Sequence, residues 1–167
     1  NMGSPAGEDG ADPDEGLHKV TLSKPFYISK YPITFEQYDK FCEATGREKP
    51  KDFNWGRGKR PVVDVSWNDA QAFCEWAGCR LVTEAEWEYA CRAGTTTPFS
   101  TGDNITTDQA NYDGSAPYKD YPEGVYRGRT TEVDELDNEN AWGVCDMHGN
   151  IYEWCADVYD AYPSDPV

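Results

Sequence analysis

The stretch from Cys145 to Cys155 (CDMHGNIYEWC) carries oxygen donors at a spacing that does not fit a regular helix. Asp146 and Glu153 each supply a carboxylate. Gly149 lets the backbone turn so that its own carbonyl and that of Ile151 point the same way. Calcium prefers such a mixture of carboxylate and carbonyl oxygens. The candidate calcium loop therefore consists of Asp146, Gly149, Ile151 and Glu153.

Two other interpretations of this stretch remain open. It can be an ordinary polar loop before a buried strand, with solvated acids and with Trp142 and Trp154 as core anchors. A zinc site would have to use Cys145, His148 and Cys155, whose spacing matches no common zinc module.

A second stretch, from Thr95 to Asn140, is rich in Gly, Pro, Thr, Asn and Asp and shows little periodicity. It is too long for an ordinary loop in a compact domain, so packed aromatic side chains or a bound cation must hold it. Its candidate oxygen donors are Asn111, Asp113 and Asp120.

Three helices are predicted to position these stretches. Each begins with a hydroxyl residue followed three positions later by a side chain that can complete the cap: Thr34 with Gln37, Ser66 with Asp69, and Thr83 with Glu86. The predicted helices run from Thr34 to a stop at Gly46, over residues 67–77 before Gly78, and over residues 84–93 before Gly94. Capping explains Glu84 and Glu86 without a catalytic role.

Short strands are predicted around Val20–Leu22, at Phe26–Ile28 and at Pro61–Val65, the first two adjacent to each other. Residues 1–16 are predicted to form a surface loop. The basic loop from Arg47 to Arg60 is a candidate for covering a groove or binding a ligand. The expected fold class is therefore mixed α and β.

Composition limits the function classes. The chain has 167 residues, a length that fits one domain. Its net charge of -16 argues against nucleic acid or an anionic membrane as a partner. No apolar run is long enough to span a membrane, and no signal peptide opens the chain, so a cytoplasmic and a secreted or periplasmic location both remain open. Signatures of serine hydrolases, phosphate loops, dinucleotide folds and His-Glu-x-x-His metalloproteases are absent.

Several segments, in order, resemble the formylglycine-generating, sulfatase-modifying factor family. The runs Thr-Glu-Ala-Glu-Trp-Glu-Tyr-Ala (83–90) and Met-His-Gly-Asn-Ile-Tyr-Glu-Trp (147–154) are the most specific. The other matching segments are residues 1–5, 26–34, 61–70, 73–78, 80–82 and 140–143.

The resemblance implies one α+β domain of the C-type-lectin-like kind over residues 1–167, incomplete at its C-terminal end and slightly so at its N-terminal end. It also implies structural calcium, because the family's calcium loop falls on Asp146, Gly149, Ile151 and Glu153. A second calcium site would begin at Asn111 and the carbonyl of Tyr112.

The resemblance further implies oxidation of a cysteine in a sulfatase, or in another cysteine-containing polypeptide, to formylglycine by a monomeric enzyme. The oxidant is molecular oxygen. The reaction also uses a copper ion, which two cysteines hold. Those positions are expected beyond Val167, so the catalytic residues stay unassigned and copper is assigned to none of the six cysteines present. Cys74 and Cys91 match positions that, in secreted members, pair with cysteines of the same C-terminal part. In a reducing cytoplasm both would be core thiols.

Two alternative functions remain. The fold also serves as a non-catalytic, lectin-like ligand-binding module, as in the variable proteins of diversity-generating retroelements. A relative of the sulfoxide synthases would instead need an iron-binding histidine domain upstream, which residues 1–34 do not supply.

Overall fold

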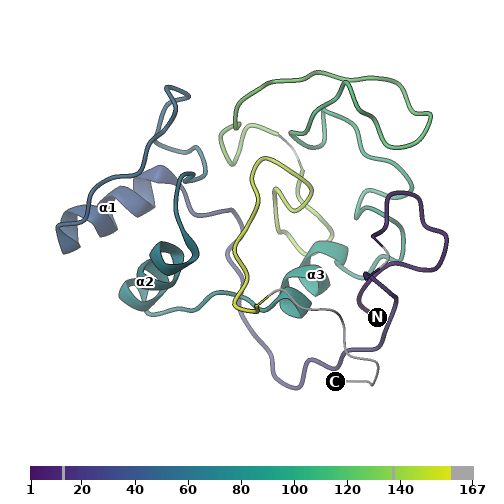
Figure 1. Cartoon of the computed structure of the whole chain (residues 1–167), viewed down its shortest axis with the longest axis horizontal. Helices are drawn as coiled ribbons and strands as arrows, with labels where there is room; N and C mark the ends of the chain where they lie inside the picture. The colour runs from purple at the N-terminus through teal and green to yellow at the C-terminus, as the bar shows by residue number, and fades with distance from the viewer. Residues whose placement is uncertain (13, 137, 159–167) are drawn as a thin grey trace.

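The computed structural model describes residues 1–12, 14–136 and 138–158. Over these residues the chain forms three α-helices: α1 at Phe35–Thr45, α2 at Trp67–Ala77 and α3 at Glu84–Arg92. Helices α1 and α2 lie side by side at one end of the molecule, and α3 lies near the middle, beside the segment 140–158 (Figure 1). Long irregular segments connect and cover the helices, as predicted for residues 95–140.

The helix starts agree with the sequence prediction. Each N-cap hydroxyl accepts the N–H of the residue three positions later, and each of those residues returns a side-chain bond to the cap, which makes three complete capping boxes. Helix α3 ends at Arg92, one residue before the predicted end. Ala93 itself adopts the left-handed conformation (φ +46°) that was expected only from Gly94.

The predicted strands are wrong for the described residues, which contain isolated β-bridges and no strand ladder. Pro61 makes a single bridge, to Thr34, and the N–H of Val62 donates to the carbonyl of Ile33 at 2.8 Å. Segments 20–22 and 26–28 have no assigned regular structure and form no bridge. An apolar alternation alone does not make a strand, because a strand also needs a partner along several residues.

The core consists of two clusters. The first joins α1 and α2 through stacked and edge-on aromatic rings: Tyr38 and Phe73 lie 5.5 Å apart, and Phe41 meets Phe73 at 5.7 Å. Cys42 and Cys74 complete it. The second cluster joins α3 to the candidate calcium loop and consists of Ala90, Cys91, Val144 and Met147.

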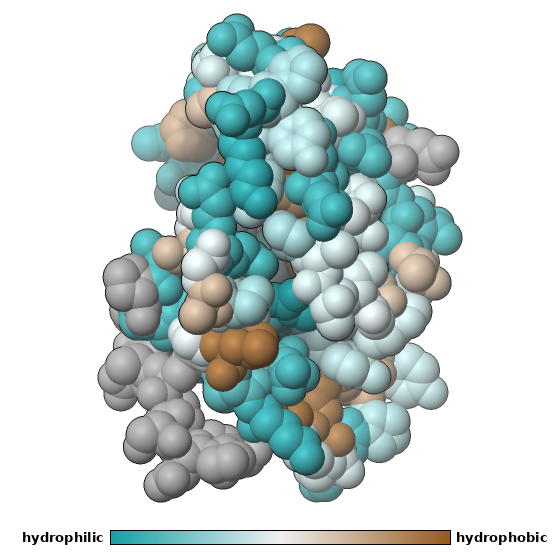
Figure 2. Space-filling model, turned by 90° about the vertical axis from the view of Figure 1, so that its right-hand side faces the viewer, coloured by the Kyte–Doolittle hydropathy of each residue, from teal (hydrophilic) through white to brown (hydrophobic). Residues whose placement is uncertain are grey.

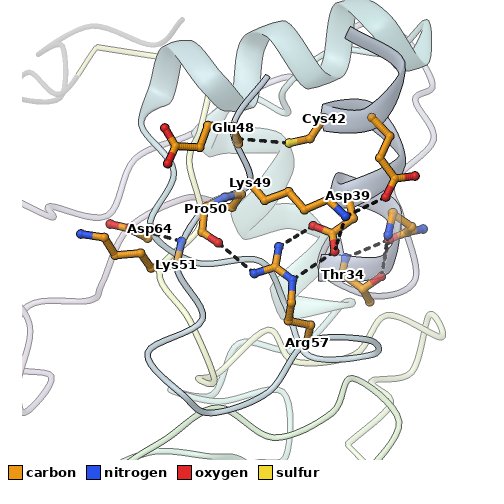
Figure 3. A network of polar contacts seen from close by, with 11 residues as sticks. Thr34, Asp39, Cys42, Glu48, Lys49, Pro50, Lys51, Arg57 and Asp64 are labelled. Atoms are coloured by element: carbon orange, nitrogen blue, oxygen red, sulfur yellow. Dashed lines mark hydrogen bonds and ion pairs between the residues drawn. The ribbon is translucent and has the colours of Figure 1, made fainter. Parts of the chain in front are cut away.

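The basic loop 47–60 is held against α1 by ion pairs within the chain (Figure 3). The guanidinium of Arg57 donates to the Asp39 carboxylate (Nε to Oδ2, 3.0 Å) and to the carbonyl of Pro50, and it lies 4.3 Å from the centre of the Phe35 ring. The hydrogen bond from Arg57 lowers the pKa of Asp39. The role predicted for this loop in ligand binding stays untested.

The segment before residue 16 was predicted to be a surface loop, but it also packs on α3. Met2 is buried, and the N–H of Gly3 donates to Glu88 at 2.9 Å while Arg92 donates to the carbonyl of Gly3. The face at the right-hand side of Figure 1 is mostly hydrophilic, with scattered apolar side chains (Figure 2). None of the helices in the described part of the chain is long and apolar enough to cross a membrane.

Candidate functional site

A groove with a volume of about 440 Å³ runs between the two core clusters. Phe73 and Cys74 form one wall, Trp87, Val144 and Met147 form the other, and the surface of the groove is mainly apolar. The remaining lining comes from segments near residues 27–33, 62–65, 79–82 and 151–154. The groove and the candidate calcium loop therefore share the residues from Ile151 to Trp154.

Among the described residues, the non-helical segments that line the groove belong to no strand. Tyr27 and Tyr152 are fully exposed, and neither lies in a strand or bridge. Trp154 is half exposed and donates its indole N–H to the carbonyl of Val65 at 3.0 Å. Trp142 is also half exposed and packs on Tyr89, with 4.7 Å between ring centres. The interpretation of Trp142 and Trp154 as core anchors is therefore wrong.

Asp146 is buried, and its two carboxylate oxygens have different environments. One oxygen, Oδ1, accepts from the amide of Asn138 at 2.7 Å, and the N–H of Asp146 donates back to the Asn138 side chain. The other, Oδ2, is buried without a hydrogen-bond partner among the described residues. Burial raises the pKa of Asp146, and the amides of Asn138 and Asn150 oppose this rise. A buried carboxylate oxygen without a partner is a position where a cation fits.

Glu153 lies at the edge of the groove and accepts from the indole N–H of Trp87 at 2.5 Å. The residue keeps an exposed face, but protein atoms crowd its carboxyl group, and this desolvation raises its pKa. The Trp87 hydrogen bond lowers the pKa, whereas the negative charge of Asp146 raises it further. The two carboxyl groups thus repel each other in a poorly solvated region, which a cation would relieve.

Gly149 lies against the backbone of Asn111, where a Cβ would come within 2.6 Å of the Asn111 carbonyl oxygen. The N–H of Asn150 donates to the same oxygen at 2.8 Å. The carbonyl of Gly149 accepts from the N–H of Ile151 at 2.8 Å. The structure therefore brings Asn111, which was assigned to a second calcium site, next to the first predicted loop.

The other predicted donors have partners within the protein or lie apart. The Asn111 amide donates to Asn150 Oδ1 and to the carbonyl of Arg129, and the Tyr112 hydroxyl donates to the carbonyl of Ile105. Asp113 accepts from the N–H and hydroxyl of Ser115, and Asp120 is exposed. Of the second predicted site, Asn111 lies beside the loop 145–155.

His148 has a structural role in this arrangement. Its Nε2 accepts the N–H of Ser100 at 2.9 Å, and its ring meets Phe99 edge-on. Burial, and then the charge of Arg92, lower its pKa, which favours the neutral ring that this contact requires. Among the described residues, no three His, Cys, Asp or Glu side chains gather at metal-binding distance, so the alternative zinc set of Cys145, His148 and Cys155 does not form.

Sequence reasoning missed three residues of this site: Trp87, Asn138 and Asn150. Nothing in the sequence indicated a hydrogen bond from Trp87 to Glu153. Asn150 Oδ1 accepts from the N–H of Thr131 and from the Asn111 amide, and so joins two distant stretches. The one available signal was the Gly149-Asn150 pair, which is typical of a tight turn.

Comparison with known proteins identifies the family. Residues 1–165 match the model of the sulfatase-modifying factor enzyme 1-like domain. A formylglycine-generating enzyme from Mus musculus is 39% identical over 89% of this chain and 38% of its own length. A protein named inactive C-alpha-formylglycine-generating enzyme 2, from Bos taurus, is 30% identical over 97% of this chain and 68% of its own length.

The similarity also extends to proteins with another name. A serine/threonine-protein kinase pkn1 from Chlamydia caviae is 32% identical over 90% of this chain, but the match covers only 25% of that protein. The chain thus spans about a quarter of the length of the pkn1 relatives. The family match nevertheless covers nearly all of the chain and confirms the resemblance seen in the sequence. The chain belongs to the family of sulfatase-modifying factor enzyme 1-like domains.

Proposed function

We propose that this chain is part of a formylglycine-generating domain with the C-type-lectin-like fold of its family, which oxidises a cysteine of a sulfatase polypeptide to formylglycine. The similarity to a formylglycine-generating enzyme, 39% identical over 89% of the chain, carries this proposal. The groove between the two clusters agrees with it, since its walls include segments outside any helix or strand, which offer backbone groups and apolar surface to further chain. In this proposal the rest of the domain packs there.

Copper is assigned to no residue of this chain. Cys42, Cys74, Cys91 and Cys145 are buried, and the described residues hold no group of three or more metal-binding side chains. What this chain would supply is a scaffold for the reaction centre, namely the two core clusters and the loop 145–155.

Calcium is part of the proposal, in a structural role. The buried Oδ2 atom of Asp146 without a partner, and the repulsion between Asp146 and Glu153, both favour a cation at the loop. Asp146 and Glu153 would hold it together with the carbonyls of Gly149 and Ile151. The nearby Asn111 and the carbonyl of Tyr112 form the proposed second set.

A test uses the full-length protein that contains this chain, loaded with copper and supplied with oxygen and a reducing agent. The substrate is a Cys-x-Pro-x-Arg peptide, and a Ser-x-Pro-x-Arg peptide is the matched control. Mass spectrometry with an aldehyde-reactive hydroxylamine probe is expected to label the first peptide and not the second. An unmodified cysteine in the presence of fully loaded copper would overturn the oxidase proposal.

The second candidate is a non-catalytic binding module. It is favoured by the similarity to a protein whose name describes an inactive enzyme, at 30% identity over 97% of this chain. In the same experiment, this candidate predicts that the peptide binds, as measured by fluorescence anisotropy, and that its cysteine keeps its thiol.

A further inference from the structure

Trp87 joins α3 to the candidate calcium loop through one side-chain hydrogen bond. Its indole N–H donates to Glu153 Oε2 at 2.5 Å, across 66 positions of the sequence. All six tryptophans of the chain lie in the described residues. The indole groups of Trp67 and Trp154 donate to backbone carbonyls. Trp87 is therefore the tryptophan that donates to a carboxylate, and this carboxylate belongs to a predicted calcium ligand.

The backbone that follows Glu153 is anchored by two hydrogen bonds. The indole N–H of Trp154 donates to the carbonyl of Val65 at 3.0 Å. The N–H of Ala156 donates to the carbonyl of Val82 at 2.8 Å. These bonds restrain the main chain, but they leave the rotatable bonds of the Glu153 side chain free.

The hydrogen bond from Trp87 restrains that side chain. It uses Glu153 Oε2, while Oε1 makes no hydrogen bond to the other described residues. A carboxylate that is ordered only when a cation binds loses its rotamer freedom at that moment, and this loss weakens binding. A carboxylate that is already held avoids most of the loss. Trp87 therefore prepares Glu153 for a cation.

Trp87 is itself held by rigid parts of the fold. Its backbone N–H donates to the carbonyl of Thr83 at 2.9 Å, in the first turn of α3, where the capping box fixes the helix start. Its side chain packs on the second core cluster and lines the groove. Further chain packed in the groove would cover this ring without taking its N–H, which already has a partner in Glu153. A hydrogen-bond donor on a packed helix positions its partner more firmly than one on a loop.

We propose that Trp87 is a positioning residue for the candidate calcium loop, which orients the Glu153 carboxylate for the ion and so connects the loop to the wall of the groove. The inference rests on the structural calcium proposed above and adds a residue that controls its binding. Trp87 acts through Glu153 and does not bind the ion itself. In metal sites, the loss of such a partner typically lowers metal affinity about 10–100-fold.

The first test is a calcium titration of the full-length protein that contains this chain, after chelator treatment, by isothermal titration calorimetry. Trp87→Phe removes the indole N–H but keeps an aromatic ring on α3, and circular dichroism checks that it folds. We expect its dissociation constant for calcium to rise about 10–100-fold. Trp142→Phe is the matched control and should leave the constant unchanged. Trp142 also packs on α3, through Tyr89, but its indole donates no hydrogen bond to the described residues.

The second test follows the indole N–H of Trp87 by nitrogen–proton correlation spectroscopy of the unmodified protein. Its signal is assigned from the neighbouring backbone signals and is absent from Trp87→Phe. Calcium should shift this signal, because the Glu153 carboxylate would share its negative charge between the indole and the ion. Glu153→Gln should abolish the shift. A tryptophan with a purely structural role would not respond in this way.

The outcomes separate this inference from the calcium proposal. If the unmodified protein binds calcium and a folded Trp87→Phe binds it equally well, Trp87 does not position Glu153. An indole signal that stays in place when calcium binds leads to the same conclusion. If the chelator-treated unmodified protein takes up no calcium, the proposed calcium role is itself wrong, and the inference about Trp87 fails with it.

Discussion

The carbonyl oxygen of Asn111 lies 2.6 Å from the position that a Cβ atom on residue 149 would occupy, and the N–H of Asn150 donates to that same oxygen. This contact joins the long irregular stretch 95–140 to the loop 145–155. The Asn150 side chain strengthens the junction through the N–H of Thr131 at 2.8 Å. Contacts with this one carbonyl therefore help to fix the position of the loop that carries Asp146 and Glu153.

Replacing Gly149 with alanine should destabilise the protein. The new methyl group would meet a backbone oxygen that is itself hydrogen-bonded, so the two segments must move apart. We expect a loss of about 1–3 kcal/mol in the free energy of unfolding, typical of an overpacked site. Urea denaturation followed by circular dichroism measures it.

The matched control is Gly16→Ala, since a Cβ at Gly16 meets no atom within 4 Å. It should change the unfolding free energy by less than about 0.5 kcal/mol. Equal effects of the two substitutions would show that the contact between Asn111 and residue 149 does not limit stability.

Asp146→Asn should have opposite consequences with and without calcium. In chelator, the variant should be more stable than the unmodified chain by about 1 kcal/mol, because it removes a buried charge with one unsatisfied oxygen. With calcium, the unmodified chain should gain about 2.7 kcal/mol at a hundredfold excess over Kd, and the variant should gain little. Thermal melting in calcium and in chelator measures both effects.

Asp113→Asn controls for the loss of one negative charge, because Asp113 is exposed and bonded to Ser115. This variant should respond to calcium like the unmodified chain. If Asp146→Asn keeps a full calcium response, Asp146 does not bind the ion.

The helices could be predicted from sequence because their determinants are local. Thr34, Ser66 and Thr83 begin the three helices with side chains that act within one turn, and the buried residues Phe41 and Phe73 lie within the predicted helices. Only the last residue of α3 differed, because Ala93 took the left-handed conformation usually left to glycine.

Strand pairing and the surroundings of the candidate site could not be predicted, because both depend on contacts between residues that are distant in the sequence. Segments such as 26–28 carry the apolar pattern of a strand, but no nearby sequence specifies whether a partner pairs with them. The neighbours of Asp146 and Glu153 lie up to 66 residues away, as in the bond between Trp87 and Glu153, so donor spacing alone named the acids but not their environment. Donor chemistry grouped Asp146 with Glu153, the family resemblance pointed to the same residues, and calcium at this loop stays a prediction.

The pair of Glu86 and Arg80 predicts a pH dependence. Both carboxylate oxygens of Glu86 accept from Arg80 at 2.7 Å, and this lowers the pKa of Glu86 from 4.5 to about 2. The folded state therefore holds the proton more weakly than the unfolded state. The resulting stability is present above pH 4.5 and is lost as the pH falls towards 2.

Glu86→Gln keeps a side chain that can close the capping box but removes the charge. At pH 7 it should cost about 1–3 kcal/mol, and the difference from the unmodified chain should shrink between pH 4.5 and 2 in urea denaturation. Glu36→Gln, at an exposed first-turn acid of α1, serves as the control and should change stability by a few tenths of a kcal/mol at most. If the difference in unfolding free energy between Glu86→Gln and the unmodified chain does not change with pH, the charge of Glu86 is not what stabilises the fold.

The last prediction concerns Arg57, which connects the loop 47–60 to α1 through Asp39 and Phe35. The side chains of Arg57 and Asp39 are 29% and 19% exposed, so removing the arginine leaves a largely desolvated carboxylate without its main partner. Arg57→Ala should therefore cost about 1–3 kcal/mol in urea denaturation.

Comparison variants distinguish charge from geometry. Arg57→Lys keeps the charge but loses the forked contact to Asp39 and Pro50. Its loss in the free energy of unfolding should therefore be smaller than that of Arg57→Ala but greater than zero. Lys40→Ala breaks the exposed pair with Glu36, where both side chains are more than 60% exposed, and should cost less than about 0.5 kcal/mol. In a double-mutant cycle, Asp39→Asn should abolish most of the effect of Arg57→Ala, since the two substitutions remove the same interaction. Additive effects would instead mean that Arg57 acts through the Phe35 ring and the loop backbone, independently of Asp39.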